Sequence, residues 1–521
     1  MSEKAESQID TDPYPKHPPS PEQLVNRGIE IEKFDSVLDR ISRQGPVPSN
    51  LFEWYGSPGI GKSMLVTLLA QECDKKSVPW LSINFKRGRK DKKAYLLDPI
   101  ILIEDMLDDL AKKVNLGDHA LLEQIKKYRA VRLPEDGAVI AYYNMDQDER
   151  LYHRPDWLDE LRNVVIAFIR LINHLGGEVG SGNVHPFVLF FDETEYAEIE
   201  LVDWIEEWIV NPVTQMKHCV VVWTARRPWR WKRPEIRRRL TSEALALFSP
   251  DVVKEQIASE SAAPDLAEQL FKNVHIITGG HPFASNVVIR QMNTLAEQGR
   301  TITSETFSEF EPQFLREIFG QFIEHYAFKG LKTIELKTAC EFMALVRLFD
   351  TTMLREVLKA CAGAPFDTWE QEDFGDLLMQ LKKTQLLVWE KGYALDPGLR
   401  HIIQKYYMAL NRETYILANR AALGVFEDWL TRPVDNRGLF VVEELYHCAA
   451  LRQVGEPVDL TAVLEKRLQE YPTWIKDSQA LDNALERLEG EIGNDQELER
   501  YTQTNIGLVE HVQSFRAKRS S

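Results

Sequence analysis

Short apolar segments alternate with segments of helical periodicity along the first half of the chain. Short, largely apolar runs of strand length occur at 51–55, 78–85, 187–191, 219–224 and 244–248. Such runs are typical of strands that are buried on both faces of a parallel sheet. The segments between them have apolar residues at helical spacing, so the pattern predicts an α/β domain with right-handed crossovers and helices on both faces.

After Pro250 the pattern becomes helical. Apolar residues spaced three and four apart predict helices at 252–257, 266–277, 284–295, 338–348, 352–361 and 374–383. Two short strands, 385–390 and 392–395, follow with Lys391-Gly392 as the turn between them. Three helices and a hairpin indicate a winged helix. The rest of the chain is helical, with amphipathic stretches at 414–430, 439–451 and 481–488.

These patterns predict a chain of several parts. They are a lead-in at 1–21, an α/β core at 22–250 with a helical insertion at about 87–180, a helical domain at 251–314, a winged helix at 315–410 and an all-α region at 411–521. The proline-rich lead-in has no apolar core, so we expect a flexible segment and not a signal peptide. The apolar runs fall far short of the roughly 18 residues of a membrane span. We therefore expect a cytoplasmic protein without a membrane partner.

Charge and cysteine content narrow the choice of partners. The chain has 63 basic and 80 acidic residues, a net charge of −17, so any attraction to nucleic acid or anionic lipid must be local. Its five cysteines lie far apart without a CxxC pair. This argues against a disulfide framework or a zinc site and predicts reduced thiols.

A glycine-rich motif follows the first predicted strand. Residues 56–63 read GSPGIGKS, which matches GxxxxGK(S/T) between a strand and a helix. In that context backbone N–H groups and a helix N-terminus face a bound phosphate. Lys62 is expected to reach the β and γ phosphates, and the Ser63 hydroxyl to complete a Mg²⁺ site. The expected nucleotide contacts in the loop are Gly56, Pro58, Gly59, Ile60, Gly61, Lys62, Ser63 and Met64.

Two further strands end in residues suited to phosphate chemistry. The buried strand 187–191 runs into Asp192 and Glu193, where Asp192 is expected to hold Mg²⁺ and Glu193 to orient the attacking water. The strand 219–224 is followed by Arg226, placed where a γ phosphate would be sensed. The sequence therefore predicts ATP hydrolysis with Lys62, Asp192, Glu193 and Arg226 as catalytic residues and Ser63 and Asp192 as metal ligands.

The order of these motifs resembles that of the STAND class of AAA+-related P-loop ATPases, which includes NLR-type and MalT-like regulators. Residues 25–30, VNRGIE, are similar to the hhGRExE motif that precedes the first strand of such proteins, with Asn26 where glycine is usual. Residues 278–284, TGGHPFA, are similar to the GxP motif of the STAND branch. The resemblance covers 22–410, from these motifs through the phosphate loop, acidic strand and sensor strand to the winged helix.

The resemblance implies a signal-transduction switch. ADP would hold the helical and winged-helix domains against the core, and ATP exchange would open the molecule for oligomerisation. Val25 and Arg27 would contact the adenine region, and Pro282 would close over the nucleotide. Leu395 stands where many relatives have a histidine that touches ADP, so a weaker closed state is expected. No nuclease, protease, TIR-like or kinase signature is present, so the output is expected to pass through a separate effector or regulator protein.

Two alternatives remain beside the switch. One is a DNA-associated AAA+ ATPase of the origin-recognition or loader type, which also joins such a core to a winged helix. The other, a P-loop phosphotransferase, is disfavoured by the GxP and winged-helix segments. Nucleic acid is not the favoured partner because Glu372, Asp373 and Asp376 lie in the helix that would enter the groove. Residues 331–410 contain 10 basic and 11 acidic side chains, so an intramolecular clamp is favoured.

Two basic segments have more than one interpretation. In residues 226–233 cations alternate with Trp229 and Trp231, a composition suited to nucleic acid, to tryptophans packed on the core, or to an arginine that reaches a neighbouring subunit. Arg237 to Arg239 follow in a predicted helix. Lys86 to Lys93 is expected to be a solvated loop. In the C-terminal region Tyr446 is expected in the core and His447 at the surface.

Overall fold

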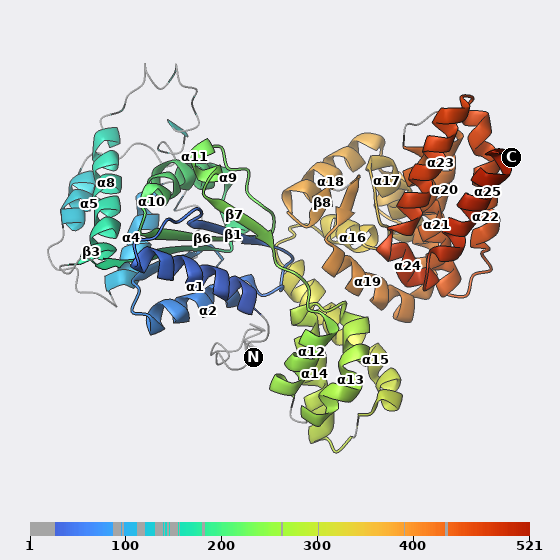
Figure 1. Ribbon diagram of the computed structural model, residues 1–521, viewed down its shortest axis with the longest axis horizontal. Helices are drawn as coiled ribbons and strands as arrows, with labels where there is room; N and C mark the ends of the chain where they lie inside the picture. The colour runs from blue at the N-terminus through green and yellow to red at the C-terminus, as the bar shows by residue number, and fades with distance from the viewer. Residues whose placement is uncertain are drawn as a thin grey trace, which may run out of the picture. The chain divides into compact units, whose positions relative to one another are not determined.

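The computed structural model describes residues 27–86, 95, 98–111, 120–130, 139, 141–142, 145, 149, 155, 157–179, 183–261, 264–300, 302–389, 391–432 and 436–520. They form two compact units, Met1–Pro264 and Asp265–Ser521 (Figure 1). Helix α12 (Pro250–Glu260) belongs to the first unit, although the sequence pattern placed the change of domain before it.

The first unit is built on a parallel sheet of five strands in the order β2-β5-β6-β1-β7. These strands are β1 (Leu51–Tyr55), β2 (Trp80–Asn84), β5 (Phe187–Asp192), β6 (Cys219–Ala225) and β7 (Leu240–Ala244). Four coincide with predicted strands. The fifth prediction, 244–248, was displaced because β7 is a partly exposed edge strand with polar residues. The apolar residues used for that prediction, Leu245 and Phe248, are buried after the strand has ended.

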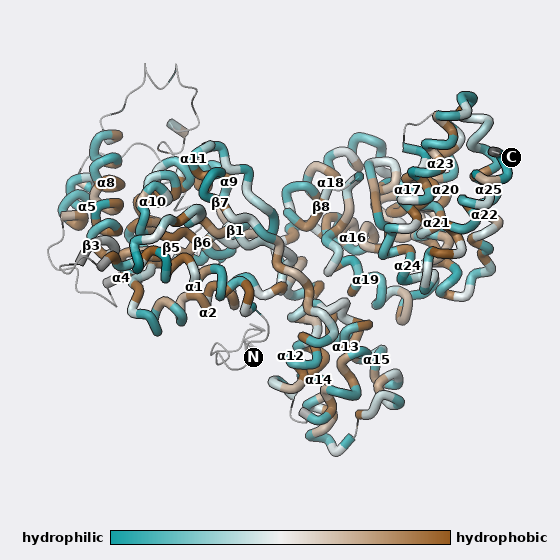
Figure 2. The backbone as a smooth tube through the Cα atoms, in the orientation of Figure 1, coloured by the Kyte–Doolittle hydropathy of each residue, from teal (hydrophilic) through white to brown (hydrophobic). Residues whose placement is uncertain are grey.

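Alternate side chains of the central strands enter two separate cores. Phe190 packs on the face covered by α1 (Gly28–Ser42) and α2 (Lys62–Lys75). Leu189 and Phe191 pack on the opposite face. That face is covered by α4 (Ile100–Ala111), α5 (Ala120–Ala130), α8 (Trp157–Leu175), α9 (Ile199–Ile205), the π-helical turn η3 (Glu206–Val210) and α10 (Asn211–Gln215). Figure 2 shows β5 and β6 as the hydrophobic centre of this arrangement.

Helices occupy much of the segment between the second and third sheet strands. The predicted helical insertion at about 87–180 contains α4, α5 and α8 in its described part, and the hairpin β3 (Gly177–Val179) and β4 (Asn183–His185) leads back to β5. Buried Asp98 accepts hydrogen bonds from Tyr128 Oη and Arg129, which joins the start of α4 to α5. The short helix α11 (Pro234–Arg237) connects β6 to β7.

The second unit begins with a helical domain and a winged helix. The helical domain comprises α13 (Ala267–Thr278), α14 (Pro282–Glu297), α15 (Ser304–Ile318) and the π-helical segment η5 (Phe319–Ala327). The winged helix comprises α16 (Ile334–Met343), α17 (Thr351–Cys361), α18 (Gln371–Lys383), the antiparallel strands β8 (Leu387–Trp389) and β9 (Tyr393–Leu395), and α19 (Pro397–Leu410). The predicted three helices and hairpin are confirmed.

The remaining helices form the C-terminal all-α region. They are α20 (Arg412–Thr431), α21 (Arg437–Gln453), α22 (Leu460–Trp474), α23 (Ser478–Gly493), α24 (Gln496–Thr502) and α25 (Ile506–Ser520). Helix α21 lies against α20, α22, α23 and α24, and twelve of its residues are buried. His447 of α21 is one of them, fully buried with Nδ1 2.8 Å from Asn419 Oδ1, so the prediction of a surface position was wrong. The hydrogen bond to Asn419 lets the polar ring enter the core; Tyr446 is buried as expected.

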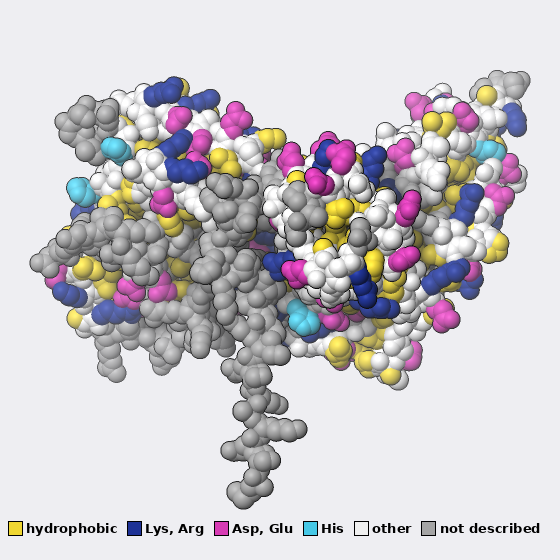
Figure 3. All heavy atoms as spheres, turned by 90° about the horizontal axis from the view of Figure 1, so that it is seen from below, with side chains coloured by type: hydrophobic (Ala, Val, Ile, Leu, Met, Phe, Trp, Pro, Cys, Tyr) yellow, Lys and Arg dark blue, Asp and Glu magenta, His cyan; other side chains and the backbone are white. Residues whose placement is uncertain are grey.

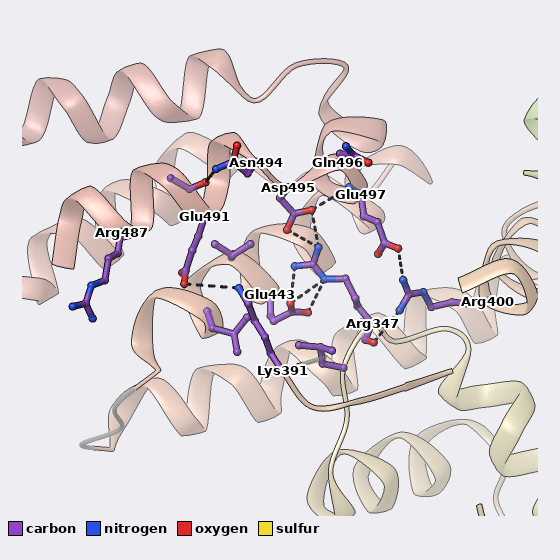
Figure 4. Close-up of a pocket in the computed structure, with 14 residues that line it drawn as sticks. Arg347, Lys391, Arg400, Glu443, Arg487, Glu491, Asn494, Asp495, Gln496 and Glu497 are labelled. Carbon is purple, nitrogen blue, oxygen red and sulfur yellow. Dashed lines mark hydrogen bonds and ion pairs between the residues drawn. The ribbon is translucent and has the colours of Figure 1, made fainter. Parts of the chain in front are cut away.

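A buried arginine joins the winged helix to the C-terminal helices (Figure 4). Arg347 donates through Nε and Nη2 to Glu443 of α21 and through Nη1 to Asp495, which caps α24. Its guanidinium also lies 4.4 Å from the centroid of the Tyr446 ring. Arg400 of α19 donates to the Arg347 carbonyl and to Glu497. These bonds fix the winged helix on α21 and α24.

Within the described part of the chain, no helix combines the length and apolar character needed to cross a membrane.

Replacing Arg347 tests this junction. Arg347→Met would leave Glu443, only 1 % exposed, without its cation, and we expect a loss of about 3–5 kcal/mol in the free energy of unfolding. Urea unfolding followed by circular dichroism measures the loss. Arg516→Met is the control, because Arg516 also pairs with several carboxylates, Asp482, Glu486 and Glu489, but nearer the surface, where ion pairs contribute little. Equal losses in both variants would contradict the role of Arg347.

Candidate functional site

The phosphate-loop motif connects β1 to α2 as the sequence predicts. Gly59 and Gly61 have φ angles of 76° and 102°, in the left-handed region that glycine adopts without strain. Gly61 is the N-cap of α2 and provides no side-chain cap, so the N–H groups of the first helical turn have no side-chain acceptor there. A helix N-terminus of this kind, preceded by a glycine turn, is suited to binding an anion.

Lys62, the first residue of α2, is only 6 % exposed. Its ammonium donates to the carbonyl oxygens of Gly56 at 2.7 Å and Ser57 at 3.0 Å, so the side chain curls over the loop. Burial lowers the pKa of Lys62, and the carboxylates of Glu195, Asp192 and Glu193 oppose this shift. The cation is thus hydrogen-bonded to the loop itself, in the electrostatic field of the carboxylates at and after the end of β5.

Asp192, the last residue of β5, connects three other elements at the carboxyl edge of the sheet. Its Oδ1 accepts from Thr224 Oγ1 at 2.6 Å and from Ser63 Oγ at 3.2 Å. Its Oδ2 accepts from Asn84 Nδ2 at 2.7 Å. Burial raises the pKa of Asp192, and the hydrogen bonds from Thr224 and Ser63 oppose the shift. The two residues predicted as metal ligands, Ser63 and Asp192, therefore lie in direct contact.

Glu193 follows Asp192 with a left-handed φ of 54°. Its backbone N–H donates to Thr224 Oγ1 at 3.1 Å, which supports this unusual conformation. The side chain is 5 % exposed and lies 3.5 Å from the Lys86 ammonium. Burial raises the pKa of Glu193, while Lys86 and a hydrogen bond from Asn84 lower it. Asn84 and Lys86 therefore hold this carboxyl group in place.

Arg226 lies directly after β6 and is buried with the residues of the short helix η2 (Thr194–Tyr196). Its Nη2 donates to Tyr196 Oη at 3.1 Å, and its Nε lies 3.4 Å from Glu195 Oε1. Glu195 interacts electrostatically with Lys62 as well, so the predicted sensor arginine and the loop lysine share one acidic neighbour.

Arg27 braces the phosphate loop from outside. Its Nη2 donates to the Ile60 carbonyl at 2.6 Å, and its Nη1 lies 3.4 Å from the carbonyl oxygen of Ala246. The guanidinium also lies over the Phe248 ring. The structure thus places Arg27 between the loop and the segment after β7. Contact with adenine remains a prediction, and Val25 lies outside the described residues.

The aromatic and basic segment 226–233 is fixed by two buried carboxylates. Glu53, in the middle of β1, accepts from the Trp229 N–H, from Trp231 Nε1 and from Ser242. Glu206 accepts from the backbone N–H groups of Lys232 and Arg233. Trp231 is 4 % exposed and packs against Trp223 at 5.1 Å. Of the three interpretations of this segment, packing of a tryptophan on the core is the one observed.

The remaining predicted site residues lie in the second unit. Pro282 is the first residue of α14, in the GxP segment, and its contact with a nucleotide stays a prediction. Leu395 is fully buried in β9. A different histidine of the winged helix, His401, reaches the GxP segment: its Nε2 lies 3.0 Å from the Ile276 carbonyl oxygen. A Cβ atom at Gly279 would lie 2.7 Å from the His401 ring, so only glycine fits there.

Three residues of the first-unit site were missed in the sequence. Asn84 lies near the end of the predicted strand 78–85 and is the last residue of β2. A polar residue at the carboxyl end of a strand was the available signal. Lys86 was interpreted as part of a solvated loop. Glu195 follows the acidic pair in the short helix η2 and was not singled out in the sequence. None of these assignments follows without the strand order, which pairs Asn84 directly with Asp192.

The donor set fits Mg²⁺ and a nucleotide phosphate. A serine hydroxyl and one carboxylate are oxygen ligands of the kind that Mg²⁺ takes when phosphate and water supply the rest. The structure shows no cluster of three or more His, Cys, Asp or Glu side chains for a metal among the residues it describes, so an all-protein cage is not formed there.

The second unit contains a cavity of about 570 Å³ (Figure 4). Its lining includes Arg347 and Glu443, which are paired with each other as described above.

The first unit is therefore an α/β domain in which a phosphate-loop motif lies at the carboxyl edge of a parallel sheet, and it is followed by a helical domain, a winged helix and an all-α region, as predicted. No known protein-family profile matches the chain, and no curated protein matches it. Among solved structures, Cdc6p from Pyrobaculum aerophilum is similar at 12 % identity over 76 % of this chain and 96 % of that chain, with a TM-score of 0.33.

Two other solved structures have the same level of similarity. The RuvB Holliday junction branch migration motor of Thermotoga maritima has 14 % identity over 74 % of this chain and 95 % of that chain, with a TM-score of 0.33. The Orc1 protein of Aeropyrum pernix, solved in complex with DNA, has 12 % identity over 74 % and 92 %, with a TM-score of 0.34.

Thr224 tests the hydrogen bonding around Asp192. Thr224→Val removes a donor to a buried carboxylate and the acceptor of the Glu193 N–H, so we expect a loss of about 1–3 kcal/mol in stability. Thermal unfolding measures it, and Thr224→Ser, which keeps the hydroxyl, is the control. A valine variant as stable as the serine variant would show that the hydroxyl contributes nothing.

Proposed function

We propose that this protein binds ATP with Mg²⁺ and hydrolyses it slowly. The observation that supports the proposal most directly is the meeting of Lys62, Ser63 and Asp192 at one edge of the sheet, beside an uncapped helix N-terminus. When bound, Mg²⁺ and the nucleotide supply the electrophilic phosphorus and the charge that polarises it.

The chain's own residues have separable roles in this proposal. The N–H groups of the loop from Gly56 to Met64 and the Lys62 ammonium bind phosphate oxygens. Ser63 and Asp192 hold the metal ion, with Asp192 acting through water. Arg226 stabilises charge on the γ phosphate.

Glu193 orients the attacking water and accepts its proton. A raised pKa suits a general base, because a group that is too acidic accepts a proton poorly. Lys86 and a hydrogen bond from Asn84 restrict the rotation of the Glu193 carboxyl group.

Two proposals concern what hydrolysis controls. In the first, the protein is a STAND-type switch that regulates or scaffolds a separate effector or partner protein, with Arg226 in cis and one of Arg237 to Arg239 acting on a neighbouring subunit. Arg237, the last residue of α11, and Arg238, its C-cap, are exposed, which suits that role. In the second, it is a DNA-associated ATPase of the origin-recognition or loader type, a proposal that the winged helix behind the core supports.

Charge on the winged helix weighs against the second proposal. The first turns of α18 present the exposed acidic residues Glu372, Asp373 and Asp376. On the face of the molecule in Figure 3, the coloured basic and acidic side chains are intermixed and do not form a broad basic surface. Binding to DNA would therefore have to rely on a small number of local contacts.

Lys62→Ala tests the nucleotide site. Loss of a charge-assisted phosphate contact costs about 1.5–3 kcal/mol, so we expect ATP affinity to fall roughly 10- to 100-fold. Titration with a fluorescent ATP analogue measures the affinity. Lys76→Ala, at the opposite end of α2, is the control and should bind normally. Equal affinity in Lys62→Ala and the parent would exclude this loop as the site.

Glu193→Gln tests the proposed base. The amide fits the same space but orients and deprotonates water poorly. We therefore expect intact ATP binding and turnover that is about 100-fold slower. Phosphate release measures turnover, with Glu198→Gln, at the exposed N-cap of α9, as the control. Unchanged turnover would remove Glu193 from the mechanism.

The Glu193→Gln protein also separates the two proposals. Light scattering with ATP and Mg²⁺, alone and with a copurified partner, shows assembly if the protein is an oligomerising switch. Turnover of the parent protein with and without duplex DNA reports on the DNA-associated alternative. A protein whose assembly state ATP leaves unchanged and whose turnover rises with DNA would favour the second proposal.

A further inference from the structure

One face of α18 carries a continuous exposed surface, which we call the α18 face. It is formed by the exposed residues Glu372, Asp376, Met379, Lys382, Lys383 and Trp389, together with the half-buried Gly375 and Tyr393. Met379 is 53 % exposed and Trp389 is 67 % exposed. The Lys382 ammonium lies 3.8 Å from Met379 Sδ and 4.5 Å from the centroid of the Tyr393 ring. The rings of Tyr393 and Trp389 lie 4.6 Å apart, so the surface runs unbroken from helix to hairpin.

A glycine on this face is not explained by the packing of the chain itself. Gly375 lies in the interior of α18, where glycine costs about 0.5–1 kcal/mol relative to alanine. A Cβ atom built at Gly375 would have nothing within 4 Å, and its φ is not in the left-handed region. Gly375 lies one helical turn before Met379, on the same side of the helix. Glycine at such a position lets another backbone or side chain approach closely.

The charges along this face are self-complementary. Asp376 lies three residues before Met379, and Lys382 lies three residues after it. Within the described residues, neither side chain has an ion-pair partner. Acidic residues occupy the first half of α18 and basic residues the last turn. Two such helices that cross antiparallel at Met379 would bring Asp376 of each copy to Lys382 of the other.

We propose that the α18 face is a docking surface for a second copy of this chain, in a twofold symmetric dimer. Met379 lies at the centre, the stem of Lys383 crosses the second copy's helix at Gly375, and Trp389 covers the side of the pair. The twofold arrangement makes both Asp376–Lys382 contacts at once, as an isologous interface requires. The dimer does not depend on nucleotide, so it is distinct from the ATP-dependent assembly of the proposed switch.

Charge decides between a second copy and a nucleic acid. A phosphate backbone would be attracted by Lys382 and Lys383 but repelled by Glu372 and Asp376 on the same face. A second antiparallel copy satisfies both signs. The surface consists of one helix and a hairpin, at the low end of interface sizes, so we expect a weak dimer with a dissociation constant on the order of 10 µM.

Charge reversal with rescue tests the proposal. Asp376→Lys and Lys382→Asp each place like charges opposite one another twice, and we expect dimerisation about tenfold weaker in each. The double variant restores opposite charges and should recover the parental affinity. Sedimentation equilibrium of the full chain without nucleotide measures the constant. The Lys62→Ala protein should give the parental value, which separates this proposal from that of nucleotide binding.

Two further variants keep the test independent of the charges. Gly375→Ala should raise the melting temperature, because alanine favours the helix, while it weakens the dimer. Trp389→Ser should weaken the dimer about tenfold, whereas Leu417→Ala, an exposed residue of α20, should leave it unchanged. A parent protein that is monomeric up to about 100 µM, or a dimer that none of these variants alters, would overturn the proposal. The proposal would also be overturned if Asp376→Lys strengthened DNA binding and the double variant did not recover the parental dimer affinity.

Discussion

The Asp192 carboxylate connects the elements on which the site depends. It accepts hydrogen bonds from the end of β2, from the first turn of α2 and from the end of β6, three segments that are far apart in the sequence. Since a buried carboxylate without partners is strongly unfavourable, these donors are needed for Asp192 to remain in the core. The same bonds bring Ser63 to Asp192 and Thr224 to the Glu193 N–H, so the constraint that stabilises the sheet edge also arranges the proposed chemistry.

Two more buried carboxylates shape the surroundings of that edge. Glu53 and Glu206 bind N–H groups of the segment that leaves β6, and this keeps Trp231 in the core. Hydrogen bonding rather than a cation balances Glu53, whose pKa is raised by burial. A segment that looks suited to nucleic acid in the sequence is in this way used for packing, while Arg230, Lys232 and Arg233 remain exposed.

The second unit depends on the same kind of interaction. Arg347 is balanced by Glu443 and Asp495, and Arg400 by Glu497, so charged pairs join the winged helix to the C-terminal helices. The contact of His401 with the Ile276 carbonyl links α19 to the GxP segment in turn. The winged helix is thus held from two sides within its unit, while α18 keeps one face exposed.

The sequence by itself determined the strands β1, β2, β5 and β6, the helix–hairpin pattern of the winged helix, and the phosphate loop, because these follow from local periodicity and glycine spacing. It misplaced β7, whose half-exposed edge position leaves no apolar run. Only the tertiary structure brought Asn84 and Lys86 to the acidic pair, placed His447 in the core and gave Trp229 and Trp231 their carboxylate partners. Those outcomes depend on strand order and on which buried polar groups meet, and neither is encoded in the local pattern of apolar and polar residues.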